Sequence, residues 1–176
     1  MNILVTYSSG YGSTREVSET IAEVLNSESN FNVQVLSVDD VESLSSFDAV
    51  IIGGSVRADK PLANIRDFFA RFRNELLQIK LALFVVCLSA NNEEGREKVK
   101  RDYVQPLLEK YPTIKPISME AFGGKIDFDR LNPVMKSLMK KVLEKTGLPS
   151  TGSIDTRDWP FITSWAKDVK SRLKEN

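Results

Sequence analysis

Short apolar runs alternate with segments of helical period along the whole chain, and this alternation constrains the fold more than any other feature. The fourth run lacks the polar–apolar alternation of a half-exposed strand, as expected when helices cover both faces of a sheet. Strands that alternate with helices form a parallel sheet, so we predict an α/β fold. The predicted strands are 3–7, 33–36, 49–52, 81–88 and 117–122, and the predicted helices are 13–25, 65–72, 93–110, 128–145 and 161–173. We expect Pro106 to kink or end the third of these helices.

Composition limits the classes of function. The 24 basic and 24 acidic residues balance, which argues against a nucleic-acid-binding protein. The longest apolar run, 81–88, is too short to span a membrane, and no signal-like segment precedes Ile3. The sequence therefore predicts a soluble cytoplasmic protein. At 176 residues it is expected to form one domain, 1–176, in which 146–157 is a long loop.

Histidine is absent and Cys87 is the one cysteine, so neither a disulfide within the chain nor a metal site is expected. The commonest general base is also missing, and no residue stands out as an acid or a base. We therefore predict no catalytic residue and expect any redox chemistry to come from a cofactor.

The residues TYSSGYGSTRE (6–16) connect the first predicted strand to the first helix. Glycines allow the loop to fold back so that its N–H groups converge on an anion, and hydroxyls add further donors. Ser13 and Glu16 fit a capping box. No lysine follows the loop, and Arg15 stands where a dinucleotide fingerprint needs its third glycine, so a terminal phosphate fits best. An ordinary capped turn is the alternative.

YSSGYGST resembles the phosphate loop of flavodoxins, and later strand ends resemble the other two flavin loops. Within the superfamily the closest resemblance is to the group of menaquinone-dependent protoporphyrinogen oxidases. It rests on the helix entry 13–17, the loop GGSVR (53–57), the Gly123-Gly124 exit, and the stretch 155–159 (DTRDW). The resemblance implies a doubly wound five-stranded parallel sheet of order 2-1-3-4-5, with a helix inserted at about 126–146 between the fifth strand and the last helix.

The resemblance also implies that FMN is the cofactor and assigns its contacts. The expected cofactor-binding residues are Ser9, Gly10, Tyr11, Gly12, Ser13 and Thr14 in the first loop, Ser55, Val56 and Arg57 in the second, Leu88, Ser89, Ala90 and Asn91 in the third, and Gly123, Gly124 and Lys125 after the fifth strand.

Three functions follow from these features. The second and third loops contain no aromatic residue and the chain is neutral, unlike the acidic electron-shuttling flavodoxins. We therefore predict an FMN oxidoreductase that passes electrons or hydride between a small-molecule substrate and a quinone or a redox partner protein, with Arg57 stabilising the reduced flavin or pairing with a nearby aspartate. A flavodoxin-type electron carrier is the alternative. An NAD domain using Gly10, Gly12 and Asp39 is disfavoured by the broken fingerprint.

The inserted helix and three single residues have two interpretations each. The helix carries an apolar face and several lysines, which suits either peripheral membrane contact or, as we favour, packing on the sheet. Cys87 is interpreted as a small buried side chain rather than a nucleophile. Trp159 is interpreted as a core anchor for the last helix rather than a ligand cover. Lys125 faces the flavin or is a solvated loop residue.

Overall fold

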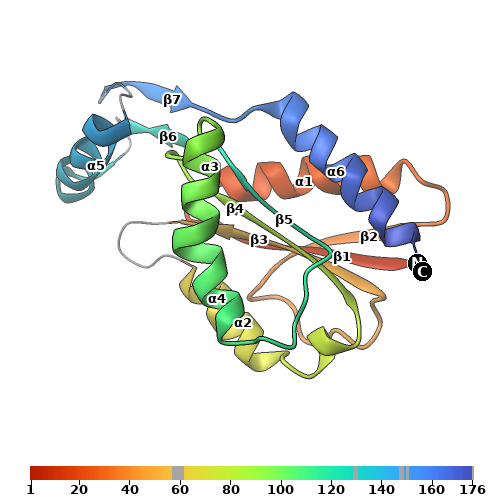
Figure 1. Cartoon of the computed structure of the whole chain (residues 1–176). Helices are drawn as coiled ribbons and strands as arrows, with labels where there is room; N and C mark the ends of the chain where they lie inside the picture. Colours follow the sequence, from red (N-terminus) through yellow and green to blue (C-terminus); the bar gives the residue numbers. More distant parts are fainter. Residues whose placement is uncertain (57–61, 129–130, 147–148, 150, 176) are drawn as a thin grey trace.

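The central sheet has five parallel strands in the order β2-β1-β3-β4-β5 (Figure 1). The computed structural model describes residues 1–56, 62–128, 131–146, 149 and 151–175. The predicted doubly wound sheet of order 2-1-3-4-5 is confirmed. Its strands are β1 (Asn2–Ser8), β2 (Asn32–Ser37), β3 (Ala49–Ser55), β4 (Lys80–Val86) and β5 (Ser118–Phe122).

Helices cover both faces of this sheet (Figure 1). On one face, α1 (Ser13–Asn26) and α6 (Trp159–Lys174) bury residues such as Val17, Ile21 and Val169 against the strands. On the other face, α2 (Ala63–Arg71), α3 (Glu93–Val99) and α4 (Gln105–Glu109) enclose a second apolar cluster. A short 3₁₀ turn, Glu75–Leu77, leads into β4.

The helical segment around Pro106 does not end there. A π-helical turn, Lys100–Val104 (η2), joins α3 directly to α4, which contains Pro106 near its start. Proline has no N–H to donate to the carbonyl one turn earlier, and a wider turn is one way for a chain to remain helical around that gap. This turn includes Tyr103, which lies beside the site described below.

The region after β5 differs most from the sequence prediction. The predicted loop 146–157 contains β7 (Ser153–Asp155), which pairs antiparallel with β6 (Lys125–Asp127). The inserted helix α5 (Pro133–Thr146) begins later than predicted, because the Asn132 side chain accepts from the Met135 amide at 2.9 Å and thereby caps it. Helix α6 begins earlier than predicted, because Asp158 caps it through the Phe161 amide at 3.0 Å.

Among the described residues, none of the helices combines the length and the apolar character needed to cross a membrane.

The seating of α6 on the sheet can be tested at Ile162, whose side chain is fully buried. Ile162→Ala should lower the free energy of unfolding by about 2–5 kcal/mol, because it removes buried methyl groups and leaves a cavity. Ser164→Ala, on the exposed side of the same helix, should change it by less than about 0.5 kcal/mol. Urea denaturation followed by circular dichroism measures both. Equal effects of the two changes would contradict the packing.

Candidate functional site

A cavity of about 200 Å³ opens where the carboxyl ends of β1, β3 and β4 meet the inserted region. Ligands of doubly wound folds bind at this edge of the sheet. The polar side of the cavity comes from the β1–α1 loop and the β4–α3 loop, and the apolar side comes from β6, η2 and α5. The lining residues are Ser9, Gly10, Tyr11, Ser13, Thr14, Ser55, Val56, Val86, Cys87, Leu88, Ser89, Tyr103, Gly124, Lys125, Ile126, Leu131, Met135 and Met139.

The β1–α1 loop turns sharply at Gly12, whose φ of +89° is unfavourable for residues with a side chain. The Gly12 amide donates to Ser9 Oγ at 3.0 Å, which closes the loop on itself. Thr14 follows in the first turn of α1 and is 1% exposed, yet its side chain borders the cavity. The Thr14 backbone carbonyl accepts from Ser18 Oγ at 2.9 Å.

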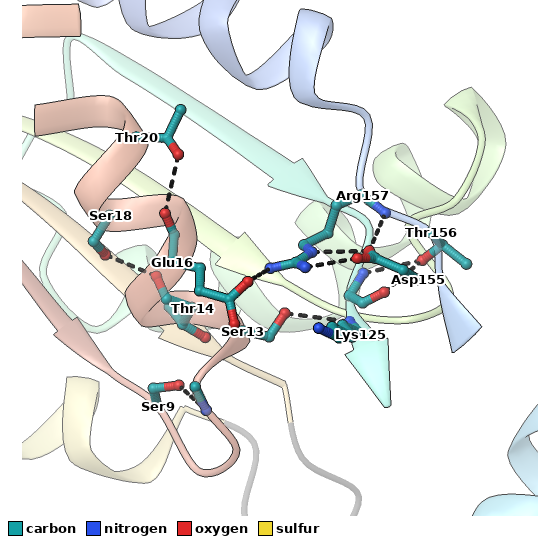
Figure 2. A network of polar contacts seen from close by, with 12 residues as sticks. Ser9, Ser13, Thr14, Glu16, Ser18, Thr20, Lys125, Asp155, Thr156 and Arg157 are labelled. Carbon is teal, nitrogen blue, oxygen red and sulfur yellow. Dashed lines mark hydrogen bonds and ion pairs between the residues drawn. The ribbon is translucent and has the colours of Figure 1, made fainter. Parts of the chain in front are cut away.

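The predicted capping box at the start of α1 is wrong. Gly12 is the N-cap residue, Ser13 is already helical, and no side chain caps the helix. Ser13 Oγ instead accepts from the Lys125 amide at 3.2 Å, and Glu16 pairs with Arg157 (Figure 2). Both side chains therefore bind the segment that follows β5. As a result, the amides of the first turn have no side-chain acceptor and remain available to an anion.

The described side chains of helix α5 pack against β6, β7 and their flanking residues rather than on the central sheet, contrary to the interpretation favoured from the sequence. Figure 1 shows it standing off the sheet beside β6 and β7. A third apolar cluster lies under it, composed of Ile126, Phe128, Leu131, Leu143 and Ile154, with Leu88, Met135 and Met139 packed against it. Met135 and Met139 also border the cavity, so α5 supplies one wall of the site. On its outer side, Val134 is 77% exposed.

Most of the residues predicted for the cofactor site line the cavity, and five of them are not among the lining residues. Gly12 shapes the loop, Ala90 is buried in the core under α3, and Asn91 is exposed and not part of the lining. Gly123 faces the chain after β7, and Arg57 lies outside the described residues.

Sequence reasoning missed the apolar wall of the cavity. Tyr103 comes from the π-helical turn and Ile126 from β6, neither of which was expected as part of the site. Burial is the main reason that the pKa of Tyr103 is raised, so its phenol stays neutral at physiological pH. The methionines were visible as an apolar helix face, but which surface this face contacts depends on the tertiary fold.

Cys87 and Trp159 take up partly buried positions. Cys87 was expected to be a small buried side chain; it is partly buried, since it packs against the core on one side and borders the cavity on the other. Its Sγ lies 3.0 Å from Ser89 Oγ. Trp159 packs at the edge of the core formed by α1 and α6, as expected of an anchor for the last helix. Lys125 is exposed and borders the cavity.

The segment after β7 packs directly on the end of β5. Thr156 accepts from the Gly124 amide at 3.0 Å through Oγ1, and its own amide donates to the Gly124 carbonyl at 2.9 Å. A Cβ placed on Gly123 would lie 1.9 Å from the Thr156 carbonyl oxygen. A glycine at position 123 therefore allows the close approach of these two backbones.

Arg157 joins this segment to the first turn of α1 (Figure 2). Its guanidinium contacts Asp155 through Nε at 2.8 Å and Nη2 at 2.6 Å, and Glu16 through Nη1 at 2.7 Å. The arginine side chain is only 2% exposed and lies 4.5 Å from the centre of the Trp159 ring. Its hydrogen bonds hold the pKa of Asp155 below the ordinary value. The stability contributed by this pair is therefore present at neutral pH and is lost as the pH falls through that lowered pKa.

Three comparisons with known proteins agree with this geometry. The family model for the flavodoxin domain matches residues 4–152. The chain is 25% identical over 169 residues to protoporphyrinogen IX dehydrogenase (quinone) of Leishmania major, covering 94% of this chain and 73% of that protein. A flavodoxin structure from the domain Archaea has a TM-score of 0.55 at 16% identity, covering 99% of this chain and 100% of that one. Two-electron reduced Megasphaera elsdenii flavodoxin has a TM-score of 0.54 at 14% identity, covering 68% and 84%.

Gly123→Ala tests the close packing behind the site. The added methyl group would collide with the Thr156 backbone, so we expect the free energy of unfolding to fall by about 1–3 kcal/mol. Ser153→Ala, an exposed change in the same segment, should have little effect. Chemical denaturation of the two variants measures the difference. An alanine at position 123 that is tolerated as well as the one at 153 would contradict the backbone contact.

Proposed function

The chain belongs to the flavodoxin-domain family, and we propose that it is an FMN-binding oxidoreductase. In this proposal, electrons or hydride pass between a bound small-molecule substrate and a quinone or a redox partner protein. FMN, when bound, would supply the redox chemistry, and the chain would supply binding, orientation and electrostatics.

The observation that carries the proposal is the environment of Thr14. Thr14 lies in the first turn of α1, is 1% exposed and lines the cavity, so its hydroxyl can form a hydrogen bond with a ligand bound there. The free amides of the first helical turn favour a negatively charged ligand at the same place. A phosphate monoester fits these donors, because the loop has no lysine of the kind that binds a triphosphate.

The rest of the cavity fits the apolar ring of a flavin. Val56, Leu88 and Tyr103 form one part of the lining, and the methionines of α5 form another. Apolar side chains of this kind pack on flat ring systems, and thioethers adapt to aromatic faces. Lys125 would hold a positive charge near the bound cofactor or its substrate. We also assign to FMN the other predicted residues that line the cavity, which are Ser9, Gly10, Tyr11, Ser13, Ser55, Ser89 and Gly124.

Two functions within the family differ in how electrons leave the flavin. The relative from Leishmania major is named a quinone-dependent dehydrogenase, which supports an enzyme with a porphyrinogen-like substrate. A flavodoxin-type carrier is the second candidate. Tyr11, 64% exposed at the edge of the cavity, favours it because a protein partner docking there would meet an aromatic side chain.

FMN should bind saturably and more tightly than riboflavin. Thr14→Ala should weaken FMN by about tenfold to a hundredfold, because one charge-assisted hydrogen bond to the phosphate is lost. Riboflavin, which lacks the phosphate, should bind the variant and the wild type alike. Quenching of flavin fluorescence measures all four affinities.

Thr20→Ala is the matched control, since it removes a hydroxyl from the same helix that bonds the Glu16 carbonyl at 3.1 Å. It should leave both affinities unchanged. Absence of saturable FMN quenching by the wild type would overturn the assignment of the cofactor.

The enzyme and the carrier can be separated by turnover. The FMN-loaded protein should convert protoporphyrinogen IX to fluorescent protoporphyrin when menadione is the acceptor, at a rate above that of free FMN. The control mixture omits the quinone. A protein that accepts electrons from a flavodoxin reductase but gives no porphyrin above the free-FMN rate would instead be a carrier.

A further inference from the structure

Glu16 presents an electrostatic difficulty for an anion bound at the start of α1. It lies in the first helical turn, two residues after Thr14, and its side chain is 48% exposed. A carboxylate in this turn is attracted to the same helix N-terminus that would hold a phosphate, and it repels a second anion there. Unless its charge is compensated, Glu16 should weaken phosphate binding.

Arg157 compensates this charge from a distant part of the sequence. Its Nη1 lies 2.7 Å from Glu16 Oε2, and the guanidinium is held in place by the two-point contact with Asp155 (Figure 2). Hydrogen bonding to Asp155 first, and then to Glu16, raises the pKa of Arg157, so the side chain remains cationic. Arg157 does not line the cavity, and Glu16 is the residue through which it contacts the first turn of α1.

We propose that Arg157 is a positioning residue for phosphate binding: it neutralises Glu16 and holds its carboxylate against the segment after β7, away from the N-terminal amides of α1. This inference rests on the proposed function, since the phosphate belongs to FMN. It adds a residue that neither the flavin loops nor the cavity lining contains.

The test is a double-mutant cycle of Arg157→Gln, Glu16→Gln and the variant with both changes, measured with two ligands. Arg157→Gln should weaken FMN by roughly threefold to thirtyfold, the range expected for one unpaired charge at a helix terminus. Riboflavin affinity should change by less than about twofold, because riboflavin carries no phosphate. Adding Glu16→Gln to Arg157→Gln should restore most of the FMN affinity, since the repelling carboxylate is then absent.

The other end of the same two helices offers a matched control. Lys174 pairs with Glu28 at 2.6 Å and so connects the end of α6 to the residues after α1. Lys174→Gln also removes one positive charge from a salt bridge with a glutamate, far from the phosphate loop. The ratio of FMN to riboflavin affinity should stay at the wild-type value in this variant.

Several outcomes would overturn the inference. Equal weakening of FMN and riboflavin by Arg157→Gln would show that the arginine only supports the fold. A selective loss that Glu16→Gln fails to restore would exclude neutralisation as the cause. Failure of the wild type to bind FMN would instead overturn the proposed function, because the cycle starts from a protein that binds it.

Arg157→Lys keeps the test decisive if the glutamine variant does not fold. Lysine retains the positive charge but cannot form the two parallel hydrogen bonds that the planar guanidinium donates to Asp155. Because the charge that neutralises Glu16 is kept, the ratio of FMN to riboflavin affinity should stay within about twofold of wild type, even if the free energy of unfolding decreases. A folded lysine variant that loses the preference for FMN would contradict the proposal.

Discussion

The parallel register of the central strands determines where every part of the site lies. Ser8 at the end of β1 is level with Gly54 in β3, Ser55 is level with Val86 in β4, and Val86 is level with Phe122 in β5. Because parallel strands end at the same edge, the loops that follow them are close together whatever their sequences. The hydroxyls after β1 and the thiol and hydroxyl after β4 therefore border one cavity. Helices on both faces fix this register by burying the strands.

The features that the sequence predicted well depend on local patterns. Apolar runs and helical periods located the strands and helices and indicated a parallel sheet, and the glycine and hydroxyl residues before α1 mark its loop. The strand order came from the resemblance to flavodoxins rather than from these patterns. A local pattern can also mislead. Ser13 and Glu16 have the spacing of a capping box, yet both side chains bind the segment after β5 or β7. The pattern correctly identified where the helix begins. It could not show that groups from distant segments would bind the Ser13 and Glu16 side chains in place of the helix amides.

The features that the sequence did not predict depend on contacts between distant segments. Nothing near Gly123 indicates that the Thr156 carbonyl oxygen will occupy the space where a side chain would lie. The strand β7 has only three residues, too few for a periodic signal, and it exists because it pairs with β6. The face of α5 is apolar by sequence, but only the third cluster shows that it borders the cavity rather than the sheet.

The segment from β7 to Arg157 connects the polar and apolar ends of the site. Through β7 it pairs with β6, which carries Lys125 and Ile126 into the cavity and supports α5. Through Arg157 it binds Glu16 in the first turn of α1. A shift of this segment would therefore move the apolar wall and change the charge at the phosphate loop together. None of the residues of this segment, 153–157, lines the cavity, yet through these contacts it holds both walls of the site.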